Sequence, residues 1–191
     1  MKITLLAALI TTAATCAAVA APEKYLLDAP HSQIVFSYNH LGYSTSHGMF
    51  SGFEGVLMFD PDDPAGSSVS VSMPVQSMFT GWQERFDHFM SKDFLGASED
   101  ELISFKSTAI EVTGDNTALI TGDLTLNGVT RPVVLDAVLN QAGMHPMAGK
   151  PWAGFDASAS ILRSQFDLGM FTPFVGDEIT IQISVEAMKA D

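Results

Sequence analysis

Histidines are the residues of this sequence best suited to acid–base or metal chemistry, and three of the five fall within one 17-residue stretch. His31, His40 and His47 could bind a metal ion if strand pairing brought them together, with Asp28 or Glu54 completing the site. Their spacing matches no established metal motif, and histidines at turns often only cap backbone groups. We therefore predict no metal site and keep a site built on these three histidines as the alternative.

A second set of ionisable residues lies further along the chain. Arg85 and His88 are three residues apart, so on a helix they share one face. They could meet an anionic headgroup at the mouth of a pocket, and the alternative is a solvated helix face. Arg163 lies in a run of Ala, Ser and Ile that is typical of a strand. If this cation points inward, it needs an anionic partner, because burial of an unpaired charge is costly.

Motifs of the common enzyme classes are absent from the sequence. The chain has no G-x-S-x-G, H-E-x-x-H, G-x-G-x-x-G, Walker A or EF-hand pattern, so hydrolases, zincins, dinucleotide enzymes and calcium hands lose their strongest support. Asp28, His31 and Ser32 have the residue types of a catalytic triad, but sequence neighbours on a strand point to opposite faces. We predict a protein without catalytic residues or cofactors.

The N-terminal segment has the pattern of a secretory signal peptide. Lys2 precedes an apolar run, and a small-residue stretch ends in Ala18-Val19-Ala20-Ala21, which predicts cleavage after Ala20. Residues 1–20 would be removed, and residues 21–191 would form a single domain in the periplasm. A membrane anchor is the alternative, but the apolar part is far shorter than the ~20 residues needed to span a bilayer.

Charge and cysteine content restrict the partners further. The only cysteine, Cys16, lies in the signal segment, so the mature chain would have no thiol or disulfide, and lipidation of Cys16 is a minor alternative. Removal of Lys2 leaves 8 basic against 22 acidic residues, a formal charge of −14. Such a surface repels phosphate backbones and anionic headgroups. We expect no nucleic acid partner and no stable membrane insertion.

Alternation with a period of two dominates the rest of the chain and predicts about nine strands. The glycines between Gly48 and Phe59 indicate one strongly bent strand, and Asn127-Gly128 predicts a hairpin with a type I′ turn. Between Gly81 and Leu95, apolar residues recur at helical spacing and predict one short amphipathic helix. The predicted strands cover residues 25–28, 33–39, 48–59, 68–73, 102–113, 117–126, 133–140, 155–162 and 179–188.

Many antiparallel strands in one domain predict a barrel or a sandwich. The bent strand favours a barrel, and the 13 Phe and 10 Met residues are suited to lining an adaptable apolar cavity. The alternative from composition is that the same side chains form a dense core.

Six segments, in order, carry a family resemblance. They are Asp28-Ala-Pro-His-Ser32 leading into Phe36, His40-Leu-Gly42, Gly48-Met-Phe50 with Phe53 and Gly55, Phe105-Lys-Ser-Thr108, Gly122 to Val133, and Arg163-Ser164 with Phe166 and Gly169. From Tyr25 to about Glu186 the chain therefore resembles the YceI family of exported, lipocalin-like, polyisoprenoid-binding proteins.

This resemblance implies an all-β fold, an eight-stranded antiparallel lipocalin-like barrel with a short helix near one end. It also implies an apolar tunnel that holds a long-chain isoprenoid or similar amphiphile, of polyprenyl phosphate or quinone type, for transport, storage or sequestration. Burial of the chain at about 0.8 kcal/mol per CH₂ would supply most of the affinity. The predicted ligand-binding residues are Phe36, Tyr38, His40, Phe50, Phe53, Met73, Trp82, Arg85, Phe86, His88, Phe89, Phe155 and Arg163.

Two questions stay open at this level. An enzyme acting on a hydrophobic small molecule inside the same barrel is the alternative function, with acid–base groups drawn from His31, His40, Asp87, His88 or Arg163. Exposed strand edges or a tunnel opening would make a homodimer useful.

Overall fold

The computed structural model describes residues 21–191, so the predicted signal peptide lies outside the described residues. The strands are β1 (Glu23–Leu27), β2 (Gln33–His40), β3 (Ser44–Phe50), β4 (Glu54–Phe59), β5 (Ser68–Pro74), β6 (Leu102–Gly114), β7 (Thr117–Leu126), β8 (Val129–Met144), β9 (Pro151–Leu162) and β10 (Glu178–Lys189). One α-helix, α1 (Gln83–Phe89), and four 3₁₀ turns complete the described part of the chain. No helix among these residues is long and apolar enough to cross a bilayer.

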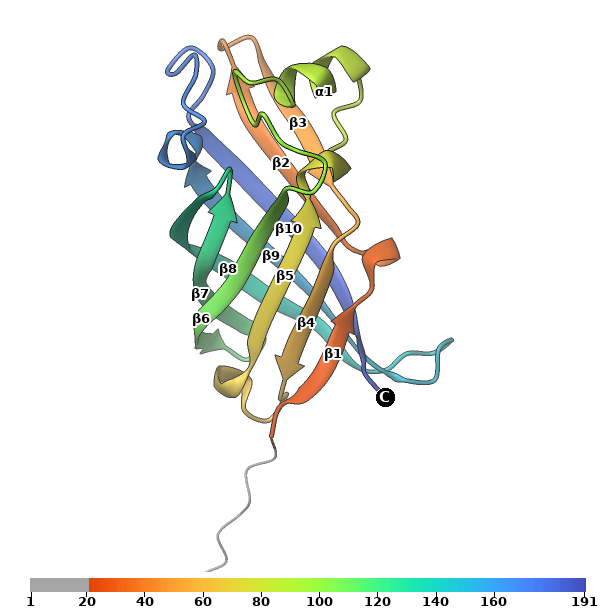
Figure 1. Cartoon of the computed structure of the whole chain (residues 1–191). Coiled ribbons are helices and arrows are strands. Elements are labelled where there is room, and N and C mark those ends of the chain that lie inside the picture. Colours follow the sequence, from red (N-terminus) through yellow and green to blue (C-terminus); the bar gives the residue numbers. More distant parts are fainter. Residues whose placement is uncertain (1–20) are drawn as a thin grey trace, which may run out of the picture.

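Antiparallel pairing closes the sheet into a barrel (Figure 1). The order β1-β4-β5-β6-β7-β8-β9-β10 returns to its start because β1 also pairs with β10, with Tyr25 opposite Lys189. This confirms the predicted eight-stranded barrel with one short helix. β2 and β3 extend the wall at one end: β10 pairs with β1 through Ala187–Lys189 and with β2 through Thr180–Ser184.

At two adjacent places in the wall, two short strands follow one another. β1 and β2 both pair with β10, and β4 and β3 pair with β1 and β2 in turn. The 3₁₀ turn Ala29–His31 separates β1 from β2, and Pro30 at its start favours such a turn. Residues 51–53 separate β3 from β4, where Gly52 has a φ of 66°. The prediction of one bent strand over 48–59 was therefore wrong, because the glycine breaks the pairing instead of only bending it.

The helix is shorter than the predicted range of 81–95. It ends at Phe89, where the Ser91 hydroxyl donates to the carbonyl of His88 at 2.7 Å and Gly96 N donates to the carbonyl of Ser91 at 2.8 Å. A serine that bonds to the nearby backbone competes with helix continuation. The Asn127-Gly128 hairpin is confirmed, with φ values of 52° and 69° that a type I′ turn requires.

Alternation separates an apolar interior from a polar outer face. On β10, Ile179, Ile181 and Ile183 line the interior, and the intervening Thr180 and Gln182 face outward. Two glycines make room for rings inside the barrel: a Cβ at Gly48 would collide with the ring of Phe36, and one at Gly122 with the ring of Phe105.

The barrel has two distinct ends. The helix end, as we call it, comprises the β2–β3 turn, the segment 75–101 that includes α1, and the loop 163–177. The turn end comprises the β4–β5, β6–β7 and β8–β9 connections. At the helix end β3 does not pair with β5, and segment 75–101 lies between them, joined to β3 by mutual hydrogen bonds between the backbones of Met49 and Phe79.

Candidate functional site

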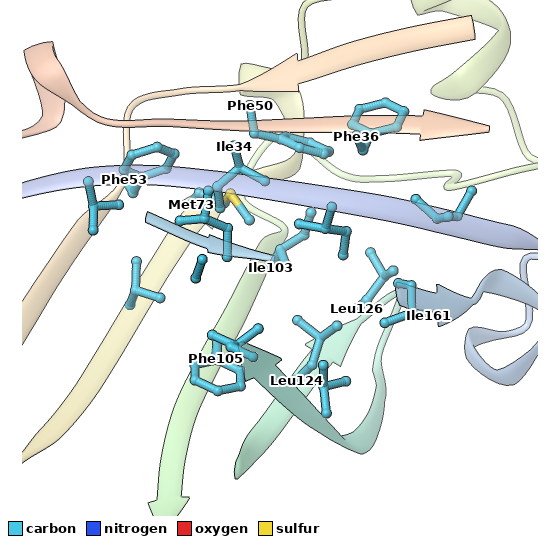
Figure 2. Close-up of a pocket in the computed structure, with 18 of the residues that line it drawn as sticks. Ile34, Phe36, Phe50, Phe53, Met73, Ile103, Phe105, Leu124, Leu126 and Ile161 are labelled. Atoms are coloured by element: carbon cyan, nitrogen blue, oxygen red, sulfur yellow. The ribbon is translucent and has the colours of Figure 1, made fainter. Parts of the chain in front are cut away.

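An apolar cavity of about 990 Å³ occupies the barrel. Figure 2 shows side chains from both walls turned toward this common interior. Its volume is at the upper end of the range of small-molecule sites, which is about 300–1,000 Å³. The central lining consists of Ile34, Phe36, Phe50, Phe53, Met73, Ile103, Phe105, Leu124, Leu126, Ile161, Ile179 and Ile181.

Aromatic contacts position α1 against the cavity wall. The Phe89 ring lies edge-on to Phe36 and Tyr38, with centroid distances of 6.4 and 6.1 Å. Near the turn end, Phe59 makes edge contacts with Tyr25 and Phe155 at 5.8 and 5.5 Å. Burial raises the pKa of the Tyr25 hydroxyl, which keeps this group neutral. Rigid aromatic walls at both levels therefore give the cavity a defined shape.

The structure brings most of the predicted ligand-binding residues to this one cavity. Twelve of the thirteen line it: Phe36, Tyr38, His40, Phe50, Phe53, Met73, Trp82, Arg85, His88, Phe89, Phe155 and Arg163. The exception is Phe86, which packs against the buried cluster around Phe36 and Val75 instead.

Polar groups are placed at the two ends of the cavity. At the helix end, His40, Ser44, Arg85 and His88 line it, together with Glu84. Arg85 donates from Nη1 to the carbonyl of Thr80 at 3.2 Å, which leaves other N–H groups of its guanidinium for a ligand. At the turn end the polar lining is Ser67, Asp115, Asn116 and Thr117. Both arginines of the lining, Arg85 and Arg163, thus lie at the helix end, together with the carboxylate of Glu84.

Arg163 is a buried cation, 8% exposed, and no carboxylate of residues 21–191 forms an ion pair with it. It donates from Nε to the carbonyl of Gly176 at 2.9 Å, from Nη1 to those of Leu168 and Met170, and from Nη2 to that of Val175 at 2.9 Å. The prediction that an inward-pointing Arg163 needs an anionic partner is therefore wrong, because backbone carbonyls accept the hydrogen bonds of its guanidinium. Burial lowers the pKa of Arg163, against the attraction of the Asp177 carboxylate.

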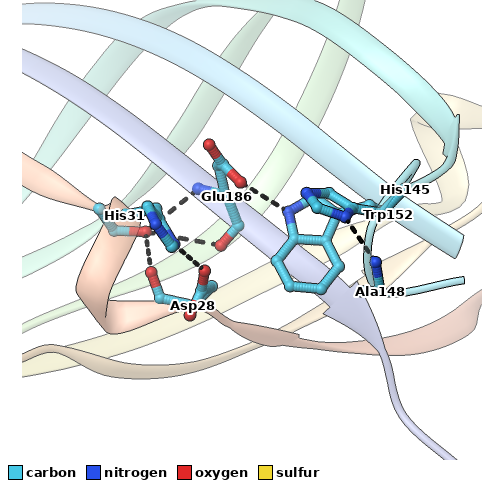
Figure 3. Close-up of polar contacts among 7 residues, drawn as sticks. Asp28, His31, His145, Ala148, Trp152 and Glu186 are labelled. Atoms are coloured by element: carbon cyan, nitrogen blue, oxygen red, sulfur yellow. Dashed lines mark hydrogen bonds and ion pairs between the residues drawn. The ribbon is translucent and has the colours of Figure 1, made fainter. Parts of the chain in front are cut away.

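The residue types singled out for metal or triad chemistry separate in the structure. His40 lines the cavity. His47 on β3 is the pairing partner of Ser37 on β2, and it lies on the outer face of these two strands. His31 lies on the outer surface, where its Nδ1 is 2.6 Å from Asp28 Oδ2 (Figure 3). This hydrogen bond is the largest cause of the raised pKa of His31, and the negative charge of Asp28 is the second.

Asp28, His31 and Glu186 form the one group of potential metal ligands found among residues 21–191, with their ligand atoms within 4.8 Å of one another. Trp152 Nε1 donates to Glu186 Oε2 at 2.8 Å, and Ser32 Oγ donates to the carbonyl of Asp28 at 2.7 Å (Figure 3). Asp28 N donates to the carbonyl of Glu186 at 2.8 Å and Glu186 N donates to Ser32 Oγ at 3.1 Å, which joins the turn between β1 and β2 to β10, and the Trp152–Glu186 bond joins β10 to β9. The Asp28-to-Ser32 motif therefore builds the wall.

Sequence reasoning missed the features that widen the cavity and form its mouth. Ala118, Ala137 and Ala157 lie opposite one another on β7, β8 and β9 and line the interior with short side chains. Their alternation with polar residues was the available signal. Phe171 and Phe174 also line the mouth, and no periodic pattern in loop 163–177 marks them.

Residues 25–187 match the family model described as a YceI-like domain. The chain belongs to the YceI-like family. This finding confirms the resemblance drawn from the six segments. Protein YceI of Escherichia coli O157:H7, a relative of this YceI-like chain, is 39% identical over 172 residues, which cover 90% of this chain and 89% of that protein.

Solved structures show the same YceI-like barrel. BcnA of Burkholderia cenocepacia superposes with a TM-score of 0.75 at 26% identity and covers 84% of this chain and 98% of its own. A polyisoprenoid binding domain from Saccharophagus degradans, implicated in plant cell wall breakdown, superposes with a TM-score of 0.68 over 87% of this chain and 98% of its own. At 10% identity, this second likeness shows the fold alone.

Proposed function

We propose that this YceI-like protein binds a long-chain isoprenoid or related amphiphile, of polyprenyl phosphate or quinone type, for transport, storage or sequestration and without chemistry on it. The observation that carries the proposal is the cavity of about 990 Å³ with its nearly continuous apolar lining. Each buried CH₂ of a chain contributes about 0.8 kcal/mol, so a long tail needs few polar contacts. The description of the S. degradans neighbour as polyisoprenoid binding supports this ligand class.

The charges at the cavity ends favour one orientation of the ligand. Arg85, Arg163 and His88 line the helix end together with one carboxylate, Glu84, whereas the lining of the turn end has the carboxylate of Asp115 and, among the described residues, no arginine or lysine. A phosphate headgroup forms charge-assisted hydrogen bonds with a guanidinium and is repelled by a carboxylate. The head of the amphiphile therefore lies at the helix end, and its tail extends toward the turn end.

The location we propose is the periplasm, after removal of residues 1–20. This rests on the basic, apolar and small-residue regions of the segment that ends at Ala20. Cell fractionation followed by intact-mass measurement tests it, because the exported chain would begin at Ala21.

Native mass spectrometry with organic extraction, on protein purified from its own periplasm, tests the ligand. We expect one amphiphile per chain, and the same spectra count the chains in each particle and so test for a homodimer. A protein that arrives empty and takes up neither prenyl phosphates nor quinones would overturn the proposal.

A further inference from the structure

Exposed apolar side chains gather around the mouth of the cavity at the helix end. This aromatic rim consists of Leu41, Tyr43, Trp82, Phe171 and Phe174, of which Tyr43 is 90%, Phe174 73% and Trp82 60% exposed. They come from the β2–β3 turn, the residue before α1 and the loop after β9, which Figure 1 shows at the same end.

Contacts between these segments make the rim one continuous surface. Leu41 N donates to the carbonyl of Phe174 at 3.0 Å, and His40 pairs with Val175. The Phe171 ring lies 6.1 Å from the ring of Phe94, which follows α1. Segments far apart in the sequence therefore hold their apolar side chains together at one place.

The backbone keeps two of these side chains in place under strain. Leu41 has a φ of 57° and Phe171 a φ of 63°, a region that bulky residues rarely adopt. Between residues 21 and 191, the other non-glycine residues with positive φ are Asn127 and Asp167, whose types tolerate it. Strain retained at exposed apolar residues is typical of a surface that serves binding.

The rim is continuous with the cavity. Leu41, Trp82, Phe171 and Phe174 are exposed to solvent and also line the cavity, so an apolar path connects the interior with the outside. At the turn end, by contrast, no aromatic side chain of residues 21–191 is exposed.

On the basis of the proposed function, we propose that the aromatic rim docks on the surface of a lipid bilayer, so that a lipid moves between bilayer and cavity without crossing water. Tyr, Trp and Phe are the side chains that partition into the interfacial zone of membranes. The rim is flanked by Arg85 as well as by Glu84 and Asp87, and the chain is strongly acidic overall. Docking therefore depends on the aromatic side chains, and it favours a zwitterionic bilayer and depends weakly on salt.

The first test follows lipid transfer from the protein to vesicles. The probe is a pyrene-labelled prenol loaded into the protein, and the acceptors are vesicles of phosphatidylcholine and phosphatidylethanolamine. Docking predicts a transfer rate that rises with vesicle concentration. Tyr43→Ser should lower this rate about fivefold, equivalent to about 1 kcal/mol, and leave probe binding unchanged because Tyr43 does not line the cavity. Met147→Ser at the turn end, where Met147 is 91% exposed, is the matched control and should have no effect.

The second test reads the rim directly. In Trp152→Phe, Trp82 is the remaining tryptophan; with the cavity already filled by an unlabelled prenol, vesicles of brominated lipids should quench its fluorescence at low and at high salt. A transfer rate independent of vesicle concentration, or an unquenched Trp82, overturns docking. If the protein still takes up the probe in that case, the proposed function stands. Failure to take up the probe overturns the proposed function instead. A concentration-dependent dimer that Tyr43→Ser dissociates, without an effect of vesicles, would assign the rim to a second copy of the chain and overturn docking.

Discussion

The helix end and the turn end close the same barrel in different ways. At the turn end, short connections join consecutive strands, and β1 pairs with both β4 and β10. At the helix end, two long segments, 75–101 and 163–177, cover the opening, and β3 is an edge strand that pairs with β2 but not with β5. Continuous strand pairing thus reaches one end, whereas isolated backbone bridges and side-chain contacts hold the segments of the other.

We infer from this difference where the proposed ligand would enter. Continuous strand pairing separates only when much of the fold opens, whereas segments held by a few isolated contacts open locally at a lower free-energy cost. The helix end also has both arginines of the lining and the exposed aromatic residues. We therefore propose the more irregular end as the entrance for the ligand, as is common where loops are positioned by a rigid scaffold.

The largest effect is expected for Arg163→Met. The substitution leaves four backbone carbonyls of loop 163–177 without their donor, and we expect a loss of about 2–4 kcal/mol in the free energy of unfolding. Urea unfolding measures this loss, and hydrogen exchange should show faster opening of residues 168–176 than of the strands at the turn end.

Arg131→Met is the matched control for this prediction. Arg131 is exposed and donates a single hydrogen bond, from Nε to the carbonyl of Gln165 at 3.2 Å. We expect a change of less than about 0.5 kcal/mol. Equal losses in both variants would mean that the carbonyl contacts of Arg163 do not hold the helix end.

A block in the lower half of the cavity tests the depth of the binding site. Ala137 lines the cavity between Ala118 and Ala157, so Ala137→Phe would place a ring across the space near the turn end. We expect the affinity for a long polyprenyl chain to fall tenfold or more, about 1.4 kcal/mol. A farnesyl chain, which ends before the block, should bind with little change.

The neighbouring Val138 gives the control. It is exposed on the outer face of the same strand, so Val138→Phe adds the same ring outside the barrel. Competition with a fluorescent prenyl probe measures both variants. Equal affinity of Ala137→Phe for short and long chains would show that the tail does not reach the turn end.

Local pattern predicted most of the wall. Alternation identified strands such as Ile179 to Met188, and Asn127-Gly128 predicted its hairpin, because both depend on neighbouring residues alone. The break around Gly52 was missed, since it depends on how β1 and β2 share the edge of β10. Period two separates the two faces of a strand but does not determine which one points inward.

The site was harder to predict because its polar contacts involve the backbone. The partners of Arg163 are carbonyls, which have no signature in the sequence. Helical spacing placed Phe86 and Phe89 on one apolar face; both pack against the core, and only the packing of α1 decides that Phe89 also lines the cavity. Exposed Phe174 was unexpected, because large apolar residues are usually buried.

The cationic lining can be tested by changing the headgroup instead of the tail. Arg85→Gln should lower the affinity for a polyprenyl phosphate about fivefold, about 1 kcal/mol, because one charge-assisted hydrogen bond is lost. A neutral quinone should bind with unchanged affinity. Lys92→Gln, an exposed cation of the same segment that does not line the cavity, is the control. Equal losses for the phosphate and the quinone would place the headgroup elsewhere.

The smallest effect, on the pH dependence of the free energy of unfolding, is expected for the pair of His31 and Asp28. This pair lies on the outer wall between the two ends. The pKa of His31 is raised above 6.5 in the folded protein, so its protonated form is favoured by folding. This contribution is fully present below pH 6.5 and is lost as the pH rises through the folded pKa. Urea unfolding at pH 6 and pH 8 should therefore show a steeper decline for the unmodified protein than for His31→Gln.

The titration of His31 by NMR separates this pair from the other histidines. Asp28→Asn should return the pKa of His31 toward its ordinary value of 6.5, because the hydrogen-bonded carboxylate is the largest cause of the shift. Lipid binding should not change in either variant, since neither residue lines the cavity. A change in lipid affinity would show that the wall between β1 and β2 is coupled to the cavity, and the distinction between an entrance at the helix end and a supporting wall would then fail.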